Sequence, residues 1–220
     1  MFPSVLDKGA LDKGVEQLIL IDPSLKPLFD AYDVPELKME KNYFWALCRS
    51  IIYQQISGKA ASTIANRFLA LFSSVESIRP IDIIDINIDK LRSVGLSRQK
   101  ASYIKNIADA FYNEKVNVEN YFTMKDEEII TDLIKIKGVG KWTAEMFLLF
   151  TLRRPDIFPV TDLGVQKGFQ VFYSLDEIPT TDFMNQKADK WRPYRTIVTL
   201  YLWYAVEAVS YTHLTLPTSR

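Results

Sequence analysis

Apolar residues recur every three or four positions along most of the chain, which is the spacing of one face of an α-helix. No stretch alternates convincingly between apolar and polar residues as a half-buried strand does. The pattern therefore predicts an all-α protein of about ten helices. Besides a pair of helices within 126–150, the expected ranges are 6–20, 23–32, 43–54, 59–72, 81–94, 97–114, 163–172, 182–190 and 194–209.

The range 81–94 is ambiguous, because isoleucines at 81, 83, 84, 86 and 88 also suit a strand. A lone strand would have no partner in this chain. The interspersed aspartates and the following Gly95 favour a short helix that ends at this glycine. The next predicted helix begins at Ser97, with Arg98 and Lys100 in its first turn. This start is either a second phosphate contact or simply a capped helix.

The stretch 133–150, LIKIKGVGKWTAEMFLLF, organises the rest of the chain. It predicts a helix end, a tight Gly-Val-Gly turn at 138–140 and a second helix from Lys141 onward. Free backbone N–H groups at a helix start bind anions, and Lys135, Lys137 and Lys141 add positive charge. The pattern is typical of a DNA phosphate site. A helical hairpin without a ligand is the alternative interpretation.

Composition narrows the possible chemistry. The chain has 220 residues, 48% of them apolar, and a formal net charge of zero, so a DNA-binding face would have to be a local patch. The single cysteine, Cys48, excludes an internal disulfide, a Cys-rich zinc site and an iron–sulfur cluster, and its apolar neighbours predict a core position. The single histidine, His213, lies near the C-terminus, so the body of the chain lacks Ser–His, Cys–His and zinc-hydrolase machinery.

The turn and its flanks resemble the helix-hairpin-helix of the base-excision DNA glycosylase superfamily. The matching positions are Leu133, Ile136, Gly138, Val139, Gly140, Thr143 and Ala144. The resemblance extends over 22–209 and implies a two-lobed helical fold. One lobe would combine 1–42 with 156–209, and the other would span 43–155 with the hairpin at 126–150. DNA and a flipped base would lie in the cleft between them. Residues 210–220 are Thr-rich and lack a helical period, which predicts either a disordered tail or a sequence foreign to the gene.

Asp162 is the candidate catalytic residue. As a residue type it is an ordinary helix N-cap, but it follows Gly138 by 24 residues, where the superfamily places its catalytic aspartate. Cleavage of a base from deoxyribose builds positive charge on the sugar, which a fixed carboxylate stabilises while it orients the attacking water. No general acid is evident nearby, which favours alkylated purines as substrates because they already carry a positive charge.

Trp142 occupies the position where bifunctional members of the superfamily carry a lysine nucleophile. Tryptophan cannot form a Schiff base, so the resemblance implies a monofunctional glycosylase that leaves an abasic site. An indole can also stack on a cationic flipped base, although a core position is the alternative. The resemblance places three further residues at the substrate pocket: Tyr53, Met146 and Trp203.

The resemblance also implies how the chain grips DNA. Gln55, in the loop after the helix 43–54, falls at the wedge position that fills the gap left by a flipped base, where the bacterial inducible 3-methyladenine glycosylase carries an apolar residue. A plain polar loop is the alternative. The expected phosphate contacts are Gly138, Gly140, Lys141 and Thr143. Backbone carbonyls that would hold a monovalent cation belong to Ile134, Ile136 and Val139.

Taken together, the residues and the family resemblance imply a monomeric enzyme that removes 3-methyladenine and 7-methylguanine from double-stranded DNA and requires no cofactor. We expect it in the nucleus if the organism is eukaryotic and in the cytoplasm otherwise. No apolar run is long enough to cross a membrane. Three alternatives remain open at this point: a noncatalytic DNA-binding protein in which Asp162 is only a cap, a bifunctional glycosylase-lyase, and a purely structural helical scaffold.

Overall fold

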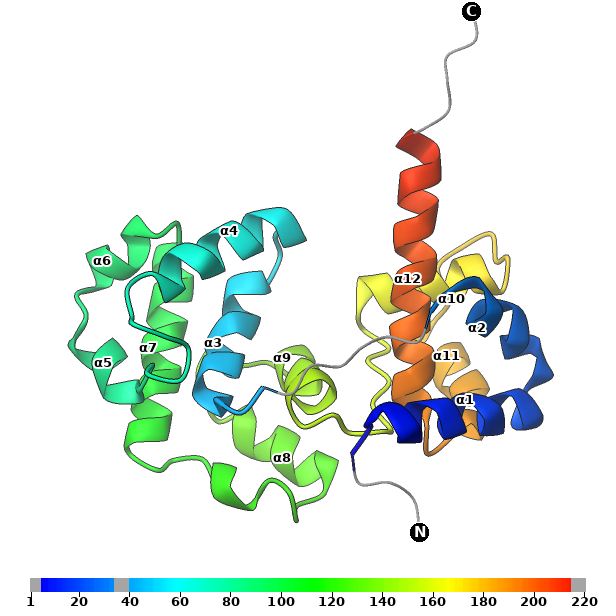
Figure 1. The fold of residues 1–220 in the computed structure, drawn as a ribbon, viewed down its shortest axis with the longest axis horizontal. Coiled ribbons are helices and arrows are strands. Elements are labelled where there is room, and N and C mark those ends of the chain that lie inside the picture. Colours follow the sequence, from blue (N-terminus) through cyan, green and yellow to red (C-terminus); the bar gives the residue numbers. More distant parts are fainter. Residues whose placement is uncertain (1–4, 34–39, 215–220) are drawn as a thin grey trace, which may run out of the picture. The chain divides into compact units, whose positions relative to one another are not determined.

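The computed structural model describes residues 5–33 and 40–214, with side chains up to residue 206, and every regular element in these ranges is helical (Figure 1). The predicted all-α fold is confirmed. The chain forms two compact units, a terminal unit of residues 1–38 and 153–220 and a central unit of residues 39–152. The sequence predicts the corresponding boundaries at 42/43 and 155/156.

The central unit is built around α7 (Arg98–Tyr112), which packs against three other helices, and the side chains of Ala101, Ile104 and Ile107 on its inner face are fully buried. The other elements of this unit are α3 (Tyr43–Tyr53), α4 (Gly58–Leu69), α5 (Pro80–Asp85), α6 (Ile88–Ser93), the 3₁₀ turn Val118–Asn120, α8 (Asp126–Leu133), α9 (Lys141–Met146) and the π-helical turn Phe147–Thr151. Cys48 on α3 is buried, as predicted, and burial raises the pKa of its thiol.

The isoleucine-rich range 81–94 is helical, but it forms two helices where the sequence predicts one. The break lies at Asn87, whose side chain accepts a hydrogen bond from the Asp89 N–H at 2.8 Å and thereby starts α6. An asparagine that caps a helix in this way competes with continuation of the preceding one.

The terminal unit is built around α12 (Arg195–Leu214), against which α1, α2 and α10 pack. Its other elements are α1 (Lys8–Ile21), the 3₁₀ turn Pro23–Leu25, α2 (Lys26–Ala31), α10 (Leu163–Phe172), α11 (Thr181–Ala188) and the 3₁₀ turn Asp189–Trp191. Ile197, Val198 and Leu202 are fully buried, as the continuous apolar pattern predicts. The helix extends beyond residue 209, where the tail is expected to begin, and residues 215–220 lie outside the described part of the chain.

Asp22 has a different role from the helix cap that its position before Pro23 suggests. Its side chain makes no cap bond but is buried, and it accepts hydrogen bonds from Ser24 Oγ at 2.6 Å, Trp191 Nε1 at 2.8 Å and Lys190 Nζ at 2.8 Å. Burial raises the pKa of this carboxyl, but the three donors outweigh that effect and hold the pKa below its usual value. The carboxylate therefore ties the N-terminal helices to residues 190–191.

The sequence also predicts a linker at 33–39, and most of it falls on residues 34–39, which are outside the described part of the chain. Within the described residues, no helix has both the length and the apolar character needed to cross a bilayer.

Candidate active site and DNA-binding hairpin

Asp162 is the N-cap residue of α10, and its side chain has a second partner besides the cap. Its Oδ1 atom accepts one hydrogen bond from the Val165 N–H at 2.8 Å and another from Trp203 Nε1 at 2.8 Å. The first bond is local, whereas the second spans 41 residues of sequence. Two donors on one oxygen fix the orientation of the half-buried carboxylate, so it is held as a preorganised negative group.

Two glycines on α10 allow this contact. A Cβ atom at Gly164 would lie 2.7 Å from Cδ1 and 2.9 Å from Nε1 of Trp203, and one at Gly168 would lie 2.2 Å from the Leu202 carbonyl oxygen. Both glycines therefore permit a close approach of α10 to α12. This approach brings the indole of Trp203 onto the carboxylate of Asp162.

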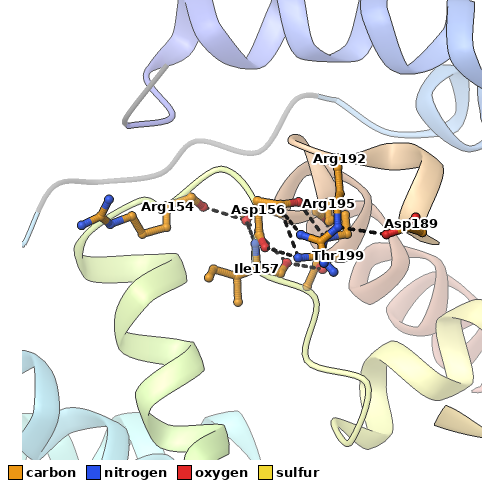
Figure 2. A network of polar contacts seen from close by, with 8 residues as sticks. Arg154, Asp156, Ile157, Asp189, Arg192, Arg195 and Thr199 are labelled. Carbon is orange, nitrogen blue, oxygen red and sulfur yellow. Dashed lines mark hydrogen bonds and ion pairs between the residues drawn. The ribbon is translucent and has the colours of Figure 1, made fainter. Parts of the chain in front are cut away.

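The loop that leads to Asp162 is fastened to the start of α12 by an ionic cluster (Figure 2). Asp156 accepts two hydrogen bonds from Arg195, one from Nε to Oδ1 at 2.6 Å and one from Nη2 to Oδ2 at 3.0 Å. Arg192 Nη1 also reaches Oδ2, at 2.5 Å, while Arg192 Nε bonds Asp189 at 3.0 Å. Burial lowers the pKa of the Arg192 guanidinium, but these two carboxylates raise it overall, so the cluster stays charged.

Two buried threonines on α12 bind the backbone of the same loop. Thr196 Oγ1 accepts from the Ile157 N–H at 2.8 Å and donates to the Arg154 carbonyl at 2.7 Å. Thr199 Oγ1 donates to the Ile157 carbonyl at 3.0 Å, as Figure 2 shows. The segment before Asp162 is therefore held by both side-chain charges and backbone hydrogen bonds.

The hairpin turn has the backbone that its two glycines predict. Gly138 has φ +107°, and a Cβ atom there would lie 2.2 Å from the Tyr103 ring of α7, so only glycine fits. Gly140 is the exposed N-cap of α9, and a Cβ atom there would meet nothing within 4 Å. Asn106 Nδ2 of α7 donates to the Lys137 carbonyl at 2.9 Å. The turn is thus held from α7 while its outer side faces open space.

The start of α9 presents backbone donors. The first intrahelical bond runs from the Ala144 N–H to the Gly140 carbonyl at 3.1 Å, so the N–H groups of Lys141 and Thr143 precede the helical ladder. The Thr143 side chain is buried, and its hydroxyl accepts a hydrogen bond from Gln54 Nε2 at 2.9 Å. The Thr143 side chain is therefore bonded within the central unit, while its backbone N–H lies at the start of α9.

The hairpin lysines differ in their partners. Lys135 Nζ pairs with the buried Asp132 at 2.7 Å, and Lys141 Nζ lies 3.7 Å from Glu145. Lys137 is exposed next to the turn. The positive charge that rings the turn in the sequence is thus partly balanced by carboxylates of the same hairpin.

The remaining predicted residues of the central unit lie on two helices and the loop between α3 and α4: Tyr53 ends α3, Trp142 is in the first turn of α9, Met146 is the last residue of α9, and Gln55 is in the loop. Trp142 and Tyr53 are half-buried, and Met146 is buried. The guanidinium carbon of Arg49 lies 5.3 Å from the centroid of the Tyr53 ring. Gln55 is exposed and has φ +55°.

The helix start at Ser97, which the sequence offers as a second phosphate contact or a capped helix, is capped by the Ser97 side chain. Ser97 Oγ accepts the Lys100 N–H at 3.1 Å, and the side chain of Lys100 turns inward to the carbonyls of Ile52 and Gln54. The preceding Gly95 has φ +109°, close to the value of Gly138 in the main hairpin.

Comparison with known proteins identifies this architecture. Residues 48–193 match the family model described as HhH-GPD superfamily base excision DNA repair protein. The chain belongs to the HhH-GPD superfamily. The resemblance expected from the hairpin residues is confirmed.

Relatives within the superfamily are similar over most of the chain. DNA-3-methyladenine glycosylase 1 of Schizosaccharomyces pombe is 33% identical over 81% of this chain and 79% of its own length. A putative DNA-3-methyladenine glycosylase of Bacillus subtilis is 30% identical over 84% of this chain and 66% of its own. The solved S. pombe 3-methyladenine DNA glycosylase, in complex with abasic DNA, superposes with a TM-score of 0.81 at 32% identity, covering 87% of this chain and 95% of that one.

Several contacts of this HhH-GPD chain escape sequence reasoning. The segment WRPYR, 191–195, gives no sign in the sequence that its two arginines bind Asp156. Lys100 and Gln54 look like ordinary surface residues in the sequence. In the structure, the Lys100 side chain binds the C-terminal end of α3, and the Gln54 side chain binds Thr143 of α9. The only local hint is the spacing of Arg192 and Arg195, three residues apart.

Proposed function

We propose that this protein hydrolyses the N-glycosidic bond of alkylated purines, 3-methyladenine and 7-methylguanine, in double-stranded DNA. The observation that carries the proposal is the carboxylate of Asp162, held on one oxygen by the Val165 N–H and Trp203 Nε1. The names of the relatives, which are 3-methyladenine glycosylases, support the substrate class.

The proposed reaction breaks the bond between C1′ and the purine nitrogen. As the bond lengthens, its electron pair leaves with the base, and positive charge grows on the sugar. Asp162 stabilises this charge and accepts a proton from the water that attacks C1′, so the products are an abasic site and a free base. A purine with a positive charge leaves as a neutral base, so the step needs no general acid.

Both units contain residues with a proposed role in the reaction. In the central unit, we propose that Trp142, Met146 and Tyr53 contact the flipped base, with the Trp142 indole attracting its positive charge. In the terminal unit, Trp203 orients Asp162. With tryptophan at position 142, the enzyme lacks the lysine needed for a Schiff base and acts as a monofunctional glycosylase.

The hairpin is proposed to hold the DNA backbone. Gly140 and the N–H groups of Lys141 and Thr143 would bind a phosphate, with Gly138 shaping the turn. Gln55 is the proposed wedge. We further propose a monomer that requires no cofactor. The carbonyls of Ile134, Ile136 and Val139 would hold a monovalent cation; Ile136 O already accepts the Val139 N–H at 2.9 Å and has a second lone pair.

The test compares Asp162→Asn with Asp7→Asn on a duplex that contains 7-methylguanine. Asp7 is a matched control because it also caps a helix of the terminal unit, with Oδ1 accepting the Ala10 N–H at 2.8 Å, and asparagine preserves such caps. We expect wild type and Asp7→Asn to release the methylated base, and Asp162→Asn to be slower by about 100-fold or more.

Equal release by Asp162→Asn would overturn the assigned mechanism. Duplex binding without any release by the wild type would favour the noncatalytic DNA-binding alternative. Borohydride should trap no covalent enzyme–DNA adduct, and a trapped adduct would show that the enzyme is bifunctional.

A further inference from the structure

The loop between α3 and α4, which carries Gln55, has a backbone that needs support. Gln55 is not glycine, yet its φ of +55° lies in the left-handed region. A residue with a side chain stays in this conformation only where the surrounding structure holds it there. Two long-range contacts provide that support.

The first contact comes from Lys100 on α7. Its Nζ atom donates to the carbonyls of Ile52 at 2.8 Å and Gln54 at 2.7 Å. These carbonyls lie at the C-terminal end of α3, where the helix leaves acceptors without intrahelical partners and where a positive charge is favourable. Burial lowers the pKa of Lys100, as expected for an ammonium group that has exchanged water for protein oxygens.

The second contact leads to the DNA-binding hairpin. Gln54 Nε2 donates to Thr143 Oγ1 at 2.9 Å, and Thr143 is buried in the first turn of α9, three residues after Gly140. The residue directly before Gln55 is therefore bonded through its carbonyl to α7 and through its side chain to α9.

We propose that Lys100 and Gln54 are positioning residues that fix the Gln55 loop relative to the hairpin. This inference rests on the proposed function, in which the hairpin grips the strand and Gln55 enters the duplex. When the hairpin binds the duplex, Gln55 is then already in the position from which it enters the duplex. Less of the binding free energy is therefore used to order the loop. Neither side chain needs to touch DNA.

The experiment compares Lys100→Met with Lys105→Met. Methionine keeps the unbranched stem of lysine and removes its donors. Lys105 is a matched control on the same helix, because its Nζ also donates to a backbone carbonyl, that of Ile84, at 2.9 Å. Base flipping is measured by the fluorescence of 2-aminopurine next to the lesion in the Asp162→Asn background, which separates this test from the chemical step.

Lys100→Met removes both charge-assisted hydrogen bonds of Lys100. We expect it to reduce the flipping equilibrium by about tenfold or more, while duplex affinity changes less than about twofold. In otherwise wild-type protein, excision of 7-methylguanine paired with cytosine should fall by a similar factor. Excision should change little when the lesion lies opposite an abasic site, where little pairing resists flipping. Lys100→Arg should restore most of the flipping, and Lys105→Met should resemble wild type.

Three results would overturn the inference. Lys100→Met could match Lys105→Met in flipping, it could lose duplex affinity as strongly as flipping, or it could lose activity equally on both duplexes. Should Lys100→Met fail to fold, Gln54→Leu removes the bond to Thr143, and the same split between flipping and affinity is required. A wild type that flips the lesion but releases no base would refute the proposed function and leave this inference standing.

Discussion

Replacement of Trp203 by phenylalanine tests whether the indole orients the Asp162 carboxylate that we propose as catalytic. The change keeps a six-membered aromatic ring and removes the five-membered ring of the indole, together with the Nε1–H that donates to Asp162 Oδ1 at 2.8 Å. A hydrogen bond to a charged group contributes about 1.5–3 kcal/mol, so loss of the full amount from the transition state would slow excision by about 10- to 150-fold. We expect kcat to fall by a factor in that range while affinity for abasic-site DNA is unchanged.

Trp191→Phe is the matched control for this experiment. The Trp191 indole makes the same kind of bond, with Nε1 donating to Asp22 Oδ2 at 2.8 Å, and it lies in the same unit. Its loss should lower the free energy of unfolding by about 1–3 kcal/mol without changing single-turnover excision per folded molecule. If Trp203→Phe keeps kcat within about twofold of wild type, or if Trp191→Phe slows excision equally, then the proposed role of Trp203 is wrong.

Two further predictions concern the hairpin and acid stability. Gly138→Ala should lower the free energy of unfolding by about 2 kcal/mol or more, because of its φ of +107° and the overlap with Tyr103, whereas Gly140→Ala, which meets nothing within 4 Å, should fold normally and weaken duplex binding. Urea denaturation and a binding titration measure the two effects, and unchanged duplex binding by folded Gly140→Ala would contradict the phosphate site. Asp22→Asn should be less stable than wild type near neutral pH. Because the folded pKa of Asp22 is below its usual 3.8, its ionised form stabilises the fold above that pH, and this contribution is lost as the pH falls through the lowered pKa. Urea denaturation across pH should show the gap closing in acid, and a constant gap would be inconsistent with an ionised, paired Asp22.

The hairpin shows how far local sequence reasoning extends. Its turn could be placed because a left-handed glycine, a helix start and apolar spacing depend on neighbours within a few residues. The same reasoning gives no sign that the Thr143 side chain is buried and bonded to Gln54, 89 residues earlier in the chain. The range 81–94 is helical, as predicted. The sequence predicts a single helix there, whereas the Asn87 cap starts a second one.

Four features of this protein could be predicted from its residues in order: the helical class, the glycine turn, the buried character of α12 and the superfamily to which the chain belongs. Each of these follows from spacing or from residue types at adjacent positions. Tertiary structure alone decided which side chains meet: Trp203 and Asp162 across 41 residues, Lys100 and Gln54 across 46, and Trp191 and Asp22 across 169. These pairs form because whole helices pack together, as α10 and α12 do at Gly168. The periodicity of apolar residues within one helix does not specify which other helix it packs against.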